Sequence, residues 1–63
     1  MTETLIAQYG SITQARNVVD DLVSTGFPQE EVFLDKDSLQ VKVMVPQAAA
    51  PEVQEILDRH NPS

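Results

Sequence analysis

Hydrophobic and polar residues alternate in two stretches of this 63-residue chain and follow a helical spacing in two others. Every second residue from position 5 to position 9 is suited to a covered face, which predicts a strand over 5–9. Residues 39–45, LQVKVMV, alternate in the same way and predict a strand with Leu39 facing inward. Residues 32–35, VFLD, predict a short strand whose phase stays open: either Phe33 faces outward, or Val32 and Leu34 do.

The helical spacing predicts two helices, over 11–25 and 51–60. In the first, Ser11 and Gln14 fit a capping box, in which each side chain bonds to the other residue's amide. Gly26 suits the left-handed residue that ends many helices, and Pro28 prevents continuation. The second helix is expected to start at Pro51, since proline favours the first helical position. Asn61 and Pro62 are expected to end it.

The element order is therefore β-α-β-β-α within a single domain over 1–63. We expect an α+β two-layer sandwich in which both helices cover one face of a three-stranded sheet. The hairpin formed by the last two strands most naturally gives the sheet order 1-3-2. This is a truncated ferredoxin-like arrangement without a fourth strand. The strand over 5–9 is then left with an unpaired edge, which is a template for pairing with another chain.

The outer side of the sheet contributes a second candidate surface. We expect it to show several hydrophobic side chains, and an exposed hydrophobic patch usually marks a partner. If Phe33 instead faces the core, this patch is smaller. The candidate interface residues of the edge and the open face together are Leu5, Ile6, Ala7, Gln8, Phe33 and Met44.

A third candidate is the turn before the first helix. Helix N-termini attract anions through their free amides, so a carboxylate or phosphate ligand has a candidate site at Tyr9, Gly10 and Ser11. The alternative for Tyr9 is that its ring packs in the core with the hydroxyl at the rim.

Composition narrows the functional classes. Ten acidic residues against four basic ones give a net charge of −6, which argues against binding to nucleic acid or to anionic membranes. No hydrophobic run approaches the roughly 20 residues of a membrane span. The N-terminal sequence has no basic cluster of the kind found in secretory signals. We therefore expect a cytoplasmic protein.

The chemistry-bearing residues are sparse. Cysteine is absent and His60 is the single histidine, so disulfides and thiolate metal sites are excluded and no metal or cofactor is expected. No nucleophile–base pair is recognisable in the sequence, so we expect no catalytic residues and no enzymatic activity. A chain this short buries only about 60% of the surface of its unfolded form, which makes added burial against a partner valuable.

The chain resembles a family of small bacterial ferredoxin-like domains of the heat-induced or general stress protein type. The resemblance rests on the AxY of residues 7–9, the Gly26-Phe27 pair, the aliphatic strand at 32–34, and the helix positions Ala15, Val18, Val19 and Leu22. It covers about half the chain. It implies the fold and a link to stress responses, and it brings no catalytic residues.

These observations predict a non-enzymatic interaction module. It would bind a second copy of the chain, or another protein, through the first strand's edge or the open sheet face. The alternative prediction is a small regulatory domain that binds an anionic ligand at the turn before the first helix.

Overall fold

The computed structural model describes residues 1–60 and 62. Three strands and two helices follow one another in the predicted order, with a single turn of 3-10 helix before β2 and another before α2. The predicted helix end at Asn61 lies outside the described residues. The main elements are β1 (Thr2–Gln8), α1 (Ile12–Thr25), β2 (Val32–Asp35), β3 (Gln40–Pro46) and α2 (Ala50–Arg59).

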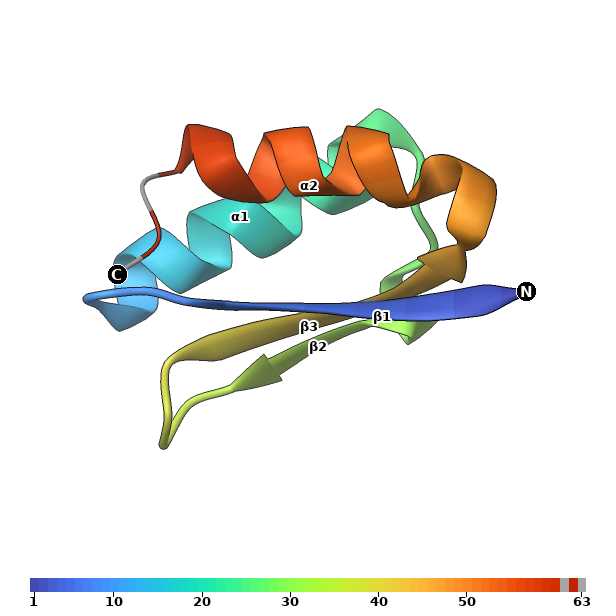
Figure 1. Ribbon diagram of the computed structural model, residues 1–63. Coiled ribbons are helices and arrows are strands. Elements are labelled where there is room, and N and C mark those ends of the chain that lie inside the picture. Colours follow the sequence, from blue (N-terminus) through green and yellow to red (C-terminus); the bar gives the residue numbers. More distant parts are fainter. Residues whose placement is uncertain (61, 63) are drawn as a thin grey trace.

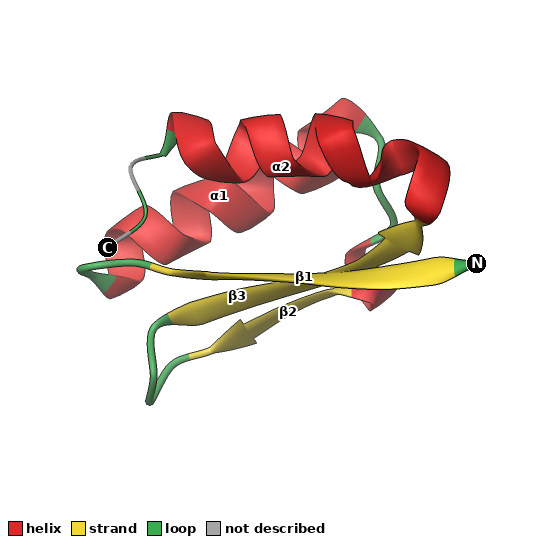
Figure 2. Ribbon diagram, viewed as in Figure 1, coloured by secondary structure: helices red, strands yellow, loops and turns green. Residues whose placement is uncertain are grey.

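The strands form one antiparallel sheet in the order β1-β3-β2 (Figure 1). Both helices lie on the same face of this sheet, which gives two layers (Figure 2). Helix α2 packs over β1, and α1 packs over β2. The predicted α+β fold and sheet order are thus confirmed, and the layout is that of a ferredoxin-like domain without a fourth strand.

The core lies between the sheet and the helices and is built around β3. Val41, Val43 and Val45 alternate along this strand and are almost completely buried. The alternation puts all three on the helix side, as expected for a sheet with one covered face. The helices and the end of β1 supply the other fully buried large side chains, which are Tyr9, Val18, Leu22, Val53, Ile56 and Leu57.

Strand β1 begins three residues earlier than the hydrophobic alternation predicts. Thr2, Glu3 and Thr4 lie opposite Pro46, Val45 and Met44 of β3. These three residues have no hydrophobic pattern of their own. The central strand extends far enough to lie alongside them and to pair with the backbone of Glu3, so pairing rather than side-chain burial sets this end of the strand.

Strand β3 begins at Gln40, because Leu39 belongs to the turn rather than to the strand. Leu39 has a φ of 57°, in the left-handed region that is uncommon for residues other than glycine. The Asp35 carboxylate accepts the Asp37 amide at 3.0 Å and stabilises the start of this turn. The short connection from β2 to β3 thus reverses direction with a left-handed residue at Leu39, and the prediction that Leu39 faces inward from a strand is wrong.

Both ends of α1 follow the sequence signals. The Ser11 hydroxyl accepts the Gln14 amide at 3.1 Å. The Gln14 side chain accepts the amide of Gly10, at 3.4 Å, rather than the predicted amide of Ser11. At the other end Gly26 has a φ of 121°, and the Phe27 amide donates to the Leu22 carbonyl.

We expect Leu57→Ala to lower the free energy of unfolding by about 2–5 kcal/mol, because Leu57 is completely buried and its loss leaves a cavity. Urea unfolding followed by circular dichroism measures this change. The matched control is Val23→Ala, on the exposed side of α1, which should change the free energy by less than about 0.5 kcal/mol. Equal effects of the two substitutions would contradict this description of the core.

Candidate functional site

The free edge of β1 is the main candidate site. In the described part of the chain this seven-residue strand pairs with β3 on one side and has no neighbour on the other. The Tyr9 amide donates to Leu39, and the Met1 carbonyl accepts from Gln47, so the odd-numbered residues direct their backbone groups toward β3. Backbone groups alternate sides along an antiparallel strand. The N–H and C=O groups that point away from the sheet therefore belong to Thr2, Thr4, Ile6 and Gln8.

The two edges of the sheet differ in how well they are protected. Natural edge strands are blunted by short length, charges, prolines or bulges. Strand β2 has four residues, ends in Asp35 and is followed by Lys36. Strand β1 is longer, contains no proline or glycine, and carries Glu3 near its start as its single charge. The β1 edge is thus the better template for a further strand.

The open face of the sheet adds an exposed hydrophobic patch beside this edge. Ile6 is 56% exposed, Phe33 49% and Met44 40%. Phe33 therefore faces outward, while Val32 is buried, which decides the phase that the sequence left open. In the sheet register Lys42 lies between Ile6 and Phe33, so a cationic side chain divides the hydrophobic ones.

A shallow hollow lies at one corner of the sheet, beside the N-terminal end of β1. Its volume is about 440 Å³. The carboxylates of Glu30 and Glu31 lie beside hydrophobic lining residues, and carboxylates in such a position favour a cationic group. The lining residues are Thr2, Glu30, Glu31, Met44, Val45 and Pro46.

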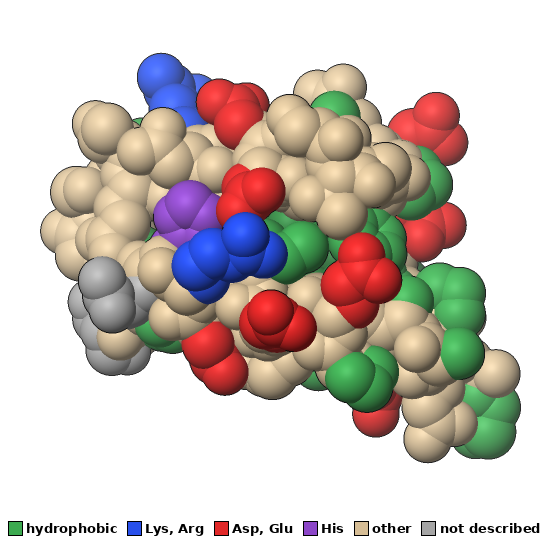
Figure 3. Space-filling view, turned by 90° about the horizontal axis from the view of Figure 1, so that it is seen from above, with side chains coloured by type: hydrophobic (Ala, Val, Ile, Leu, Met, Phe, Trp, Pro, Cys, Tyr) green, Lys and Arg blue, Asp and Glu red, His purple; other side chains and the backbone are tan. Residues whose placement is uncertain are grey.

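Seen from the helix side, the surface carries several scattered acidic side chains and fewer basic ones (Figure 3). This distribution agrees with the net charge of −6. The single histidine is visible among them, and its side chain is 24% exposed. The helix side is therefore unsuited to a polyanionic partner.

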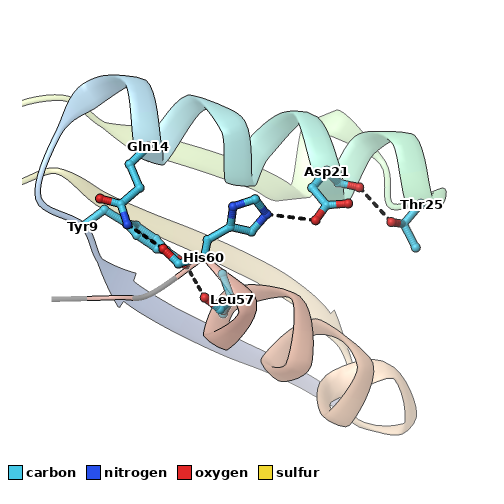
Figure 4. A network of polar contacts seen from close by, with 6 residues as sticks. All are labelled: Tyr9, Gln14, Asp21, Thr25, Leu57 and His60. Atoms are coloured by element: carbon cyan, nitrogen blue, oxygen red, sulfur yellow. Dashed lines mark hydrogen bonds and ion pairs between the residues drawn. The ribbon is translucent and has the colours of Figure 1, made fainter.

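A network of polar contacts holds the end of α2 against α1 and the end of β1 (Figure 4). The Tyr9 hydroxyl donates to the Leu57 carbonyl at 2.8 Å. The Gln14 side-chain amide donates to the His60 carbonyl, and the His60 ring lies 2.9 Å from the Asp21 carboxylate. The network joins three elements far apart in the sequence, so these residues stabilise the packing of the fold.

At the predicted anion site before α1, the side chains that would contact a ligand make hydrogen bonds within the protein. Tyr9 is 1% exposed, so its ring packs in the core as the alternative expected, but its hydroxyl bonds to the Leu57 carbonyl in a buried position rather than at the rim. The Ser11 hydroxyl accepts the Gln14 amide, and the Gly10 amide donates to the Gln14 side chain. The three residues are adjacent, but the hydroxyls of Tyr9 and Ser11 and the amide of Gly10 make hydrogen bonds within the protein.

The structure also brings together residues that the sequence did not single out. Thr2 and Thr4 contribute half of the outward-pointing backbone groups of β1. Both precede the hydrophobic alternation that predicted the strand. The contact between Asp21 and His60 spans 39 positions in the sequence. No local pattern marks either feature, since each depends on which strand or helix lies alongside.

Among residues 1–60 and 62, no three His, Cys, Asp or Glu side chains come together in a way that could hold a metal ion. In the same part of the chain, neither helix has the length and hydrophobicity needed to cross a membrane.

Comparison with protein-family models, with characterised proteins and with solved structures finds no match to this chain. The resemblance to the stress protein family thus remains a prediction from the sequence.

The Tyr9 hydroxyl gives the fold a measurable dependence on pH. Burial, and secondarily the negative charge of Asp58, raises the pKa of Tyr9 from 10.0 to about 12. Because the folded protein holds this proton more tightly than the unfolded chain, the associated stability is fully present below pH 10.0 and is lost as the pH rises toward about 12.

We expect Tyr9→Phe to lower the free energy of unfolding by about 1–2 kcal/mol near neutral pH, because the Leu57 carbonyl loses its buried donor. The wild-type protein should then lose stability between pH 10.0 and about 12 more steeply than the variant. Urea unfolding of both proteins across this range measures the difference. A constant difference up to the highest pH would show that the hydroxyl is not held in this way.

Proposed function

We propose that this chain is a small non-enzymatic interaction module that accepts an extended polypeptide segment along the free edge of β1. The observation that carries the proposal is the row of outward-pointing backbone groups at Thr2, Thr4, Ile6 and Gln8. Strand addition obtains affinity from such main-chain groups and specificity from the side chains that alternate beside them.

The open face supports the same proposal. The side chains of Thr4, Ile6 and Gln8 share this face, next to the exposed Phe33 and Met44. A strand added to β1 would place every second side chain on the open face, and the side chain opposite Ile6 would extend the hydrophobic patch. The edge and the open face therefore act as one surface.

The alternative of an anion-binding regulatory domain has less support. The hydroxyls of Tyr9 and Ser11 both make hydrogen bonds within the protein. A ligand that used the Ser11 hydroxyl would have to displace the N-terminal cap of α1, which costs about 1 kcal/mol of helix stability.

Affinity capture with matched variants tests the edge. The tagged wild-type chain is incubated with a lysate of the cells that express it and, separately, with an untagged copy of itself. Ile6→Lys places a lysine at the β1 edge, a device that natural edge strands use against pairing. Val23→Lys makes a similar change on the exposed side of α1 and serves as the control.

We expect at least one protein to be retained by the wild type and by Val23→Lys but lost with Ile6→Lys. Its binding should also slow deuterium exchange at the amides of Thr4 and Ile6, because these donors become hydrogen-bonded. If every retained protein, including the untagged copy, binds all three baits equally, the proposed function is wrong.

A further inference from the structure

We propose that the segment that occupies the β1 edge is the β1 strand of a second copy of this chain. The two strands would run antiparallel with Leu5 on the two-fold axis and join two sheets into one of six strands. This inference rests on the proposed function, since it names the partner of the same edge.

The register is the one that matches the direction of the backbone groups and also pairs the whole strand. In an antiparallel pair, residues with outward-pointing groups must lie opposite one another. With Leu5 on the axis, Thr4 lies opposite Ile6 of the partner and Thr2 opposite its Gln8. This register pairs all seven residues of β1 and satisfies every outward-pointing N–H and C=O group of both strands.

The single charge of β1 disfavours one alternative register. Glu3 is the single charged residue of the strand, and here it lies opposite Ala7 of the partner. Like charges directly opposite each other destabilise a strand pair. A two-fold axis at Glu3 would create such a contact and would leave Ile6 and the end of β1 unpaired.

The side chains near the axis also gain burial. Leu5 packs against the core but stays partly exposed at the sheet edge. In the proposed dimer it meets Leu5 of the partner in a non-hydrogen-bonded pair, where side chains approach most closely. On the other face, Ile6 comes beside Thr4 of the partner, so the two open-face patches become continuous.

The size of the contact fits a weak dimer. Helix α2 runs above β1 in the same direction, and together they form one long side of the molecule (Figure 1). The molecule measures 30 × 19 × 19 Å, so this side offers several hundred Å². A standard interface takes about 800 Å² from each partner, and smaller ones are transient. We therefore expect dissociation in the micromolar range.

Cysteine crosslinking reads the register directly, because the chain has no cysteine of its own. Directly opposite residues of a non-hydrogen-bonded pair have Cα atoms about 4.5 Å apart, within the range of about 4.4–6.8 Å that a disulfide spans. Leu5→Cys should therefore form a covalent dimer on oxidation at least about tenfold faster than Ser24→Cys on exposed α1, whose thiols meet only by collision.

Cysteine substitutions at two exposed positions of β1 check the register without disturbing the core. Thr4→Cys and Ile6→Cys should each crosslink slowly alone, since two copies of either residue are more than about 7 Å apart in this register. A mixture of the two variants should crosslink rapidly, because Thr4 lies opposite Ile6. Rapid dimerisation of Thr4→Cys or Ile6→Cys alone would overturn the register with Leu5 on the axis.

The salt dependence separates a second copy from a basic partner. Two chains of charge −6 repel each other, and raising the salt from about 0.01 M to 1 M shortens the screening length from about 30 Å to 3 Å. Sedimentation velocity from about 1 μM to 1 mM protein should therefore show tighter dimerisation at high salt. Binding of a basic segment would weaken instead.

The outcomes distinguish this inference from the proposed function. A wild-type chain that stays monomeric at every concentration and salt, with all cysteine variants crosslinking at the rate of Ser24→Cys, overturns the dimer. If a different protein is then captured through the β1 edge, the proposed function stands and only its partner changes. If neither occurs, both fall.

Discussion

The pairing of β3 with a strand on each side is the interaction on which the rest of the structure depends. This strand lies in the middle of the sheet, and its three valines are almost completely buried beneath the helices. It contributes to both backbone ladders and to the core at the same time. Strands β1 and β2 each pair only with β3, so both take their place in the sheet from this strand.

The two edge strands differ in how many residues they pair with β3. Strand β3 offers pairing along seven residues to β1 and along four to β2. Strand β1 therefore has the longer row of outward-pointing backbone groups. It has no proline and a single charge, Glu3, to discourage pairing. In a domain of 63 residues, which buries a small core, such an edge is also where further burial is most easily gained.

The polar residues around the end of α2 differ from this edge, because they make hydrogen bonds within the protein. Tyr9, Gln14 and His60 connect β1, α1 and α2 through hydrogen bonds that cover long stretches of sequence. The Tyr9 hydroxyl bond is buried and the contacts of Gln14 and His60 are partly buried, and together they hold the last turn of α2 in place. The side chains at the turn before α1 therefore take part in packing, while the outer edge of β1 has no neighbouring strand in the described part of the chain.

The sequence by itself determined the elements whose signals are local. The capped helix from Ile12 to Thr25 is an example, because its start, hydrophobic face and stop lie within neighbouring residues. The alternation of β3 and the sheet order also followed from the pattern. Tertiary structure alone decided the N-terminal extension of β1, the left-handed turn at Leu39 and the outward direction of Phe33. It also decided that Tyr9 is used by the core and that Asp21 meets His60. Each of these depends on which backbone or side chain lies alongside, and that proximity arises only when distant segments pack together.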